Sequence, residues 1–187
     1  MSATKPLPES VLISESRLQS RIHELGAQIF TDYENQELVL LGVLRGSVLF
    51  FADLARAIFR AQLADQRREV ELRFEFVQLA SYHDSTKPSA VQLIRGGSNY
   101  LEQRHVLIVE DIVDTGRTLE FLHEHLQTLN PKTVKVCTLL DKPFQRQVSI
   151  AVDYIGFEIP DAFVVGYGLD YAQKYRNLPY IATLEST

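Results

Sequence analysis

Apolar positions along the chain follow two different periods. Between residues 16 and 30, leucine and isoleucine recur at helical spacing with polar residues between them, which predicts an amphipathic helix. Residues 37–44, ELVLLGVL, are almost entirely apolar and run into an Arg-Gly turn, which predicts a buried strand. From residue 47 to 62 the apolar spacing is helical again. A strand, a turn and a helix in this order form half of a βαβ unit.

The next part of the chain changes character twice. Residues 69–76 alternate strictly between charged and apolar side chains, which predicts a strand with one face in water. Residues 81–100 are rich in Ser, Gly and Asn and show little periodic apolar signal. We therefore expect a long loop there, and a loop of that length in a compact domain usually serves function or movement.

The rest of the chain continues to alternate strands and helices. The predicted elements are a buried strand at 105–111, a helix at 119–129, a strand at 133–141 and shorter strands at 154–157 and 163–167. This alternation, with apolar strands, predicts an α/β fold with a parallel, doubly wound sheet flanked by helices. Ligands of such sheets bind beyond the carboxyl ends of the strands. The polar residues that follow each apolar run are therefore the candidates for function.

Composition narrows the class of protein. The chain has 187 residues, a length that suits one domain. Nineteen Lys and Arg against 24 Asp and Glu give a net charge of −5, which argues against a protein whose main task is to bind nucleic acid or anionic lipid. Cys137 is the only cysteine, which excludes an intrachain disulfide and a cysteine zinc cage. No apolar run is long enough to span a bilayer, so we expect a soluble, cytoplasmic protein without a membrane partner.

The segment VLIVEDIVDTGRTL, residues 106–119, carries the strongest chemical signal. Its apolar run ends in Glu110 and Asp111, and two adjacent carboxylates accept hydrogen bonds from a ribose diol or hold Mg²⁺ directly or through water. The residues that then open a helix are Asp114, Thr115, Gly116, Arg117 and Thr118. A helix N-terminus with hydroxyls and an arginine suits a phosphate, so the segment as a whole describes a site for a ribose 5-phosphate. In the alternative interpretation Asp114 caps the helix and the two acids are solvated loop charges.

This segment resembles the phosphoribosyl diphosphate signature of the type I phosphoribosyltransferases, and its wording is closest to the hypoxanthine–guanine enzymes of that family. Three other segments resemble the same family in the expected order: LLGVLRGSVLFFADL at 40–54, TLLDKP at 138–143 and DYIGFEIPDAFVVGYGLDYAQKYRNLPYI at 153–181. The resemblance covers about residues 38–181. It implies a single domain over residues 1–187, with a hood formed by the N-terminal segment and about residues 143–187.

The resemblance implies a role for each matching residue around the sugar. Glu110, Asp111 and residues 114–118 would bind the ribose and its phosphate. Asp114 would also be the catalytic residue, which takes or steadies the proton that moves at the purine N7. The residues implied to bind pyrophosphate are Leu44, Arg45, Gly46 and Arg176, with a cis peptide bond between the first two. By itself, Arg45 is equally well interpreted as an ordinary exposed charge.

The resemblance also implies a purine site and a metal. The implied purine-site residues are Lys142, Phe163, Val164 and Asp170, and the implied Mg²⁺ ligands are Glu110, Asp111 and Asp170. Lys142 would donate to the exocyclic oxygen of a 6-oxopurine; an ammonium has no acceptor, so it disfavours a 6-amino group. Phe163 would stack on the base. Without the resemblance, Lys142 is interpreted as a surface residue and residues 163–165 as a core strand.

The implied reaction needs shelter from water, because the sugar passes through an oxocarbenium-like state. The predicted loop at 81–100 stands where the family has a lid, and Ser81 and Tyr82 match the lid dipeptide. His83 occupies a position that is commonly glycine in relatives. Glycine adopts a positive φ at little cost, so His83 is expected to alter how the lid hinges.

The leading hypothesis is a purine-salvage enzyme that uses Mg²⁺ and transfers the 5-phosphoribosyl group from phosphoribosyl diphosphate to hypoxanthine or guanine, which gives IMP or GMP and pyrophosphate. The resemblance implies a homodimer or homotetramer and no nucleic-acid partner. Two alternatives stay open: a nucleotide-sensing regulator that binds RNA or DNA, which the net charge disfavours, and a transferase for another base. Lys142 and Phe163 favour purines but separate hypoxanthine, guanine and xanthine poorly, because these differ at the 2-position.

Overall fold

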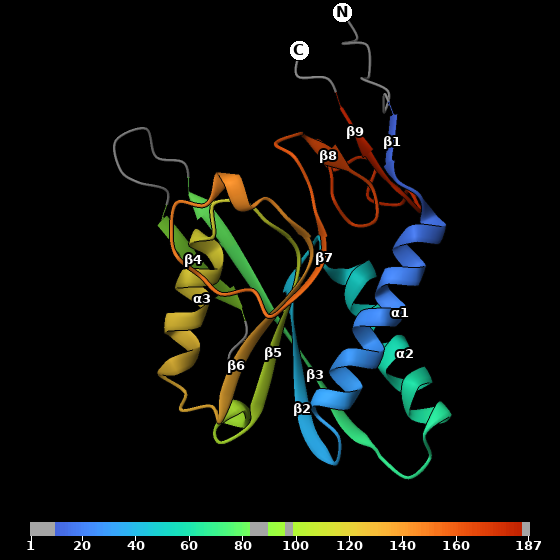
Figure 1. The fold of residues 1–187 in the computed structure, drawn as a ribbon. Coiled ribbons are helices and arrows are strands. Elements are labelled where there is room, and N and C mark those ends of the chain that lie inside the picture. The colour runs from blue at the N-terminus through green and yellow to red at the C-terminus, as the bar shows by residue number, and fades with distance from the viewer. Residues whose placement is uncertain (1–9, 83–89, 96–98, 185–187) are drawn as a thin grey trace, which may run out of the picture.

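The computed structural model describes residues 10–82, 90–95 and 99–184 (Figure 1). Its strands are β1 (Ser10–Ile13), β2 (Gln36–Leu44), β3 (Val70–Tyr82), β4 (Ala90–Arg95), β5 (His105–Val113), β6 (Thr133–Asp141), β7 (Tyr154–Glu158), β8 (Val164–Val165) and β9 (Ile181–Thr183). Its α-helices are α1 (Glu15–Asp32), α2 (Val48–Ala64) and α3 (Arg117–Gln127), and short 3₁₀ turns lie at Asn99–Leu101 and Pro143–Gln145.

The main sheet has the strand order β4-β3-β2-β5-β6-β7. Its last five strands are parallel, whereas β4 pairs with β3 in the antiparallel sense. Helices α1 and α2 cover one face of the sheet and α3 covers the other, as Figure 1 shows. The predicted parallel, doubly wound α/β fold is therefore confirmed, with one antiparallel strand added at an edge.

Burial on both faces explains the apolar strands. The side chains of Leu38, Val39, Leu40 and Leu41 in β2 are fully buried, alternately under the two helical layers. On α1 the predicted apolar face is buried, and the Ser14 hydroxyl caps the helix by accepting a hydrogen bond from the Arg17 amide. A Cβ added to Gly26 of α1 would lie 2.6 Å from the Cβ of Ala57, so a glycine lets α1 and α2 approach closely.

The prediction of one long loop at 81–100 is wrong in part. Strand β3 does not end near residue 76 but continues to Tyr82, and β4 then pairs back along it. The sequence AVQLIR of β4 has no strict alternation of polar and apolar positions. Its backbone is instead satisfied by pairing with β3, a tertiary effect that outweighs the weak local signal.

A second, smaller sheet joins the two ends of the described chain. Its order is β1-β9-β8, and all its pairings are antiparallel. The sequence pattern did not predict β1, a four-residue strand whose partner β9 lies about 170 positions away. Figure 1 shows this sheet above the main sheet, and its strands come from the two segments for which the resemblance implies a hood.

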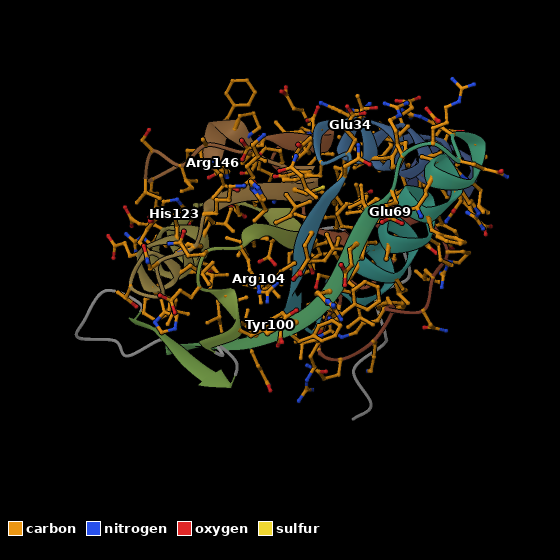
Figure 2. The ribbon with its side chains drawn as sticks, turned by 90° about the horizontal axis from the view of Figure 1, so that it is seen from below. Glu34, Glu69, Tyr100, Arg104, His123 and Arg146 are labelled. Carbon is orange, nitrogen blue, oxygen red and sulfur yellow. The ribbon has the colours of Figure 1, made fainter. Side chains whose placement is uncertain are left out.

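The amino edge of the main sheet is closed by paired side chains. Glu37, at the start of β2, accepts hydrogen bonds from the Tyr100 hydroxyl at 3.1 Å and from the Arg104 guanidinium. The same guanidinium lies 4.1 Å from the centre of the Tyr100 ring, and Figure 2 shows the two side chains together.

Among the described residues, no helix is both long and apolar enough to cross a membrane.

Candidate active site

Three loops meet at the carboxyl edge of the main sheet, and two glycines allow their contact. A Cβ added to Gly46, after β2, would lie 1.5 Å from Oδ2 of Asp111 at the end of β5. A Cβ added to Gly168, in the β8–β9 connection, would lie 1.9 Å from the carbonyl oxygen of Gly46, and Gly168 has a φ of +105°. A side chain at Gly46 would displace the Asp111 carboxylate, and one at Gly168 would collide with backbone, so the predicted pyrophosphate loop, the acidic pair and the β8–β9 connection lie in direct contact.

The loop after β2 has the implied backbone geometry. The Leu44–Arg45 peptide bond is cis. The Arg45 side chain is exposed, while Ser47 is fully buried and its hydroxyl donates to the Val43 carbonyl at 2.6 Å. The Ser47 hydrogen bond therefore ties the loop to the end of β2, while the Arg45 side chain faces solvent.

Glu110 is a buried acid, and one of its oxygens has no partner among the described residues. It is 8% exposed, and its buried Oε2 accepts no hydrogen bond from any described residue. Burial, and then the charge of Asp111, raise the pKa of Glu110 well above its usual range. A buried polar atom with no partner costs free energy, so this oxygen is placed for a ligand that brings its own donor or charge. The interpretation of Glu110 as a solvated loop charge is wrong.

Asp111 follows Glu110 in β5, but one of its carboxylate oxygens has a hydrogen-bond partner. Its Oδ1 accepts a hydrogen bond from the Ile112 amide at 2.8 Å. Burial raises the pKa of Asp111 to about 6, while backbone N–H groups and Arg176 act against that rise and Asp170 adds to it. Arg176 and Asp170 come from the β8–β9 connection, so their field reaches the acidic pair across the site.

Asp170 and Arg176 already bind each other. Their ion pair has an N–O distance of 2.6 Å, and Arg176 also donates to the Gly168 carbonyl at 2.6 Å. The second oxygen of Asp170 accepts a hydrogen bond from the Gln173 amide at 2.7 Å. Both predicted residues thus lie at the site, and the guanidinium holds the turn that contacts Gly46.

The carboxylates fit a cation only with help from a substrate. Within the described part of the chain, no three His, Cys, Asp or Glu side chains converge on one point as a metal site. The pair Glu110 and Asp111 still offers the one or two carboxylates that Mg²⁺ usually takes from a protein, with water and substrate oxygens completing its shell. These residues therefore fit Mg²⁺ bound together with a phosphorylated sugar.

The segment after β5 forms the start of α3. Gly116 is the N-cap of the helix with a φ of +85°, and no side chain caps it. The interpretation of Asp114 as the helix cap is therefore wrong. Thr115 Oγ1 accepts a 3.5 Å hydrogen bond from the Arg117 amide, and Thr118 lies in the first turn. A Cβ on Gly116 would meet Val148 at 2.9 Å, so this glycine too permits a close approach.

Lys142 is not a surface residue. It is 7% exposed, and its ammonium lies 3.6 Å from Oδ2 of Asp114 and 3.6 Å from Oδ1 of Asp161. Its backbone amide donates to the Val113 carbonyl at 2.9 Å, which fastens the turn after β6 to the end of β5. The structure thus brings together the predicted proton-handling acid and the predicted base-recognition lysine.

Phe163 and Val164 differ although they are adjacent. Val164 is buried in β8, as the core-strand interpretation expects. Phe163 is 49% exposed and meets Tyr171 edge to face, with the ring centres 5.8 Å apart. The core-strand interpretation is therefore wrong for Phe163, whose ring has an open face.

Comparison with known proteins agrees with this geometry. Residues 14–172 match the phosphoribosyl transferase domain. The chain is 44% identical over 178 residues to the hypoxanthine-guanine phosphoribosyltransferase of Bacillus subtilis, covering 95% of this chain and 93% of the relative. It is 45% identical over 184 residues to the enzyme of that name from Mycobacterium tuberculosis, covering 95% and 86%.

The solved structures give the same picture. A crystal structure of a hypoxanthine-guanine phosphoribosyltransferase from Bacillus anthracis superposes with a TM-score of 0.84 at 42% identity, covering 96% of this chain and 99% of that one. A hypoxanthine phosphoribosyltransferase from Staphylococcus aureus gives 0.85 at 43%, covering 95% and 92%. The chain belongs to the hypoxanthine-guanine phosphoribosyltransferase family.

Several residues of this family member's site were not predicted from the sequence. Arg146 donates to the Asp114 carbonyl at 2.6 Å and forms an ion pair with the buried Asp141, while the Gln147 amide donates to the Thr115 carbonyl at 3.0 Å. The segment after β6 thus braces the predicted phosphate loop. No local pattern marks Arg146 or Asp161, because both act through contacts made only in the folded chain.

The predicted lid is described only in part. Ser81 and Tyr82 lie in the last positions of β3, where they pair with Val91 and Ala90 of β4. His83 lies outside the described residues. The role of this segment as a lid stays a prediction.

Proposed function

We propose that this chain transfers the 5-phosphoribosyl group from phosphoribosyl diphosphate to hypoxanthine or guanine, giving IMP or GMP and pyrophosphate in purine salvage in the cytoplasm. Its family membership supports the reaction class. The observation that carries the choice of base is the buried Lys142 ammonium at 3.6 Å from Asp114. A buried cation beside an acid at the start of the phosphate segment suits a base with an exocyclic oxygen and a proton at N7.

The proposed roles follow the geometry around the carboxyl edge. Glu110 and Asp111 would accept hydrogen bonds from the ribose diol, and the start of α3 would receive the 5-phosphate. Arg45 and Arg176 would face the departing pyrophosphate. When bound, Mg²⁺ would neutralise charge that develops on that pyrophosphate.

The purine would lie between the exposed ring of Phe163 and the Lys142 side of the site. Lys142 would donate to the 6-oxygen of the base, and Asp114 would hold the proton at N7 while the bond to the sugar forms. Phe163 would stack on the base, a contact worth about 1–3 kcal/mol in other base-binding proteins. The Val164 backbone would meet the pyrimidine edge of the base, while its side chain is buried in β8.

The test is turnover with Mg²⁺ and phosphoribosyl diphosphate, measured separately with hypoxanthine, guanine, xanthine and adenine. We expect the 6-oxopurines to react and adenine to be inert. Lys142→Ala should lower kcat/KM for the 6-oxopurines by about 100-fold, the loss of a charged hydrogen bond. Lys132→Ala, which removes an exposed lysine at the amino edge, is the matched control and should change nothing. Absence of turnover with every purine in a folded sample would overturn the proposal and favour a nucleotide-sensing regulator.

We also propose a homo-oligomer, either a dimer or a tetramer. An apolar groove of about 910 Å³ lies between α2 and β3 and reaches Leu44 at the predicted pyrophosphate loop. Phe59, Phe74 and Phe76 line it and are 54%, 55% and 40% exposed, which is unusual for a monomer surface. Light scattering at several concentrations tests this: a mass near 21.3 kDa at all of them would overturn the proposal.

A further inference from the structure

The turn between β8 and β9 is fastened to the helical layer by one buried tyrosine. Tyr167 is 4% exposed, and its hydroxyl donates a hydrogen bond to Oδ2 of Asp53 in α2. The same carboxylate oxygen accepts a hydrogen bond from the Gln19 side chain of α1 at 3.2 Å, and Arg56 pairs with the other oxygen. Asp53 thus joins both helices of one layer to the turn that lies over the site.

The backbone of this turn leaves little freedom beside Tyr167. Gly166 and Gly168, which flank it, have φ values of +102° and +105°, and Tyr167 itself has a φ of +49°. Gly166 and Leu169 exchange two backbone hydrogen bonds of 3.1 Å, and the Tyr167 amide donates to the Leu178 carbonyl at 2.8 Å. The position of the Tyr167 hydroxyl therefore fixes the position of the whole turn.

The residue after Tyr167 contacts the predicted pyrophosphate loop. Gly168 packs directly on the Gly46 carbonyl, and its own carbonyl accepts the hydrogen bond from Arg176. Asp53 lies in α2, which begins two residues after Gly46. The turn and the loop are thus connected twice, once through the backbone contact and once through the Tyr167–Asp53 hydrogen bond.

We propose that the Tyr167–Asp53 hydrogen bond is a positioning contact that holds the Gly168 turn and Arg176 against the pyrophosphate loop and so sets the affinity for the diphosphate substrate. The inference rests on the proposed function. Neither side chain touches substrate in this role, because both act through Gly168 and Arg176. Burial and the hydrogen bond to Asp53 raise the pKa of Tyr167, while burial of Asp53 is outweighed by the hydrogen bonds it accepts, which lower its pKa. The donor therefore stays protonated and the acceptor ionised at neutral pH.

The chain offers a matched control for a purely structural effect. Tyr154, 2% exposed at the start of β7, donates its hydroxyl to Oδ2 of Asp32 at 2.7 Å. This pair has the same chemistry and similar burial, but its acceptor Asp32 lies at the end of α1, just before β2 begins at the amino edge of the sheet. Replacing either tyrosine with phenylalanine removes one buried hydrogen bond to a carboxylate and keeps the ring.

The experiment compares wild type, Tyr167→Phe, Tyr154→Phe, Asp53→Ala and the double variant of Tyr167→Phe with Asp53→Ala. We expect Tyr167→Phe to raise the KM for phosphoribosyl diphosphate about tenfold. The KM for hypoxanthine and kcat should stay within about twofold.

Tyr154→Phe should lower the melting temperature by about as much as Tyr167→Phe does, but should leave the KM for phosphoribosyl diphosphate unchanged. Asp53→Ala, which also removes the contacts with Gln19 and Arg56, should raise the same KM, and adding Tyr167→Phe should raise it no further, because the Tyr167–Asp53 hydrogen bond is already lost. Asp53→Asn, which keeps an acceptor oxygen, should restore the wild-type KM.

Three results would overturn the inference: an unchanged KM in Tyr167→Phe, an equal rise in Tyr154→Phe, or additive effects in the double variant. If Tyr167→Phe does not fold, Asp53→Ala against Asp53→Asn makes the same comparison. An inactive wild-type protein would instead overturn the proposed function, so the two failures are distinguishable. Calorimetric titration with phosphoribosyl diphosphate gives the same comparison as a dissociation constant, without turnover.

Discussion

Glu37 and Glu110 lie in neighbouring strands of one sheet, and the protein treats them in opposite ways. At the amino edge, burial of Glu37 alone would raise its pKa, but hydrogen bonds from Arg104 and Tyr100 outweigh that effect and hold the pKa below its usual range. At the carboxyl edge, burial and the charge of Asp111 raise the pKa of Glu110, whose buried oxygen has no described partner. The first acid serves the fold, whereas the second is held at a cost to the fold and is available to a ligand.

The same division separates the loops at the two edges. At the amino edge, Tyr154 donates a hydrogen bond to Asp32, although the Tyr33 hydroxyl and His105 Nε2 are buried there without a described partner. At the carboxyl edge, glycines bring backbones and acids together until Gly46 almost touches Asp111. The difference between the edges is therefore clearest in their glutamates: Glu37 is paired within the fold, whereas Glu110 has an oxygen that is left for a ligand.

The largest expected effect is that of replacing Glu110, the glutamate at the carboxyl edge. Glu110→Gln should lower kcat/KM by about 100-fold, because it removes a charged acceptor for the sugar. The same change should raise the melting temperature above pH 4.5, because it removes a buried acid whose ionisation the fold disfavours and the unfolded chain does not. Steady-state kinetics and thermal unfolding of one sample check both signs. A lower melting temperature together with unchanged activity would contradict the division described above.

The next effect compares two glycines that allow close contacts: Gly46 at the site and Gly26 in the core. Gly46→Ala forces a Cβ onto Asp111, whereas Gly26→Ala forces one onto Ala57 between α1 and α2. Both should destabilise the fold by about 1–3 kcal/mol, the usual range for overpacking. Only Gly46→Ala should also raise the KM for phosphoribosyl diphosphate, by about tenfold or more. Equal kinetics for the two variants would show that Gly46 has only a packing role.

A smaller effect concerns Glu37. Glu37→Gln should lower the free energy of unfolding by about 1 kcal/mol, a value reduced for the partial exposure of its ion pair, and should leave kcat and KM unchanged. Urea unfolding with parallel kinetics measures both. A loss of activity without a loss of stability would reverse the roles assigned to the two glutamates.

The smallest effect is the pH dependence of stability that these glutamates produce. The folded-state pKa of Glu37 lies below its ordinary value of 4.5, so its contribution is present above pH 4.5 and is lost as the pH falls through the lowered pKa. The folded-state pKa of Glu110 lies above 4.5. Its contribution to stability is therefore lost as the pH rises from 4.5 through that raised pKa. Unfolding curves of Glu37→Gln and Glu110→Gln should differ from wild type with opposite slopes against pH. Parallel slopes would contradict this assignment.

Local patterns in the sequence predict the framework of this fold well. The strand predicted at 133–141 is β6 with the same bounds, because its apolar run is buried on both faces. Strand β5 extends two residues beyond the predicted strand at 105–111, to Ile112 and Val113, because both still pair with β6. Strands β1 and β4 were missed, since each depends on a partner strand rather than on its own sequence.

The chemistry of the site was predicted residue by residue only where the resemblance supplied it. Spacing alone indicated Glu110, Asp111 and the start of α3, because they follow a buried strand directly. It did not indicate that Lys142 is buried against Asp114, that Arg146 braces the phosphate segment, or that Tyr167 reaches Asp53. Each of these contacts joins residues that are far apart along the chain or depends on burial, which only the folded structure defines.

The most direct test of this division is a site-resolved carboxyl titration of the free protein by ¹³C NMR, with Glu37→Gln and Glu110→Gln used to assign the two signals. We expect Glu37 to titrate below 4.5 and Glu110 well above it in the same sample. If both glutamates titrate together near 4.5, the Glu110 carboxyl group is exposed or paired in solution. That result would contradict the conclusion that the carboxyl edge keeps a buried acid available for a ligand.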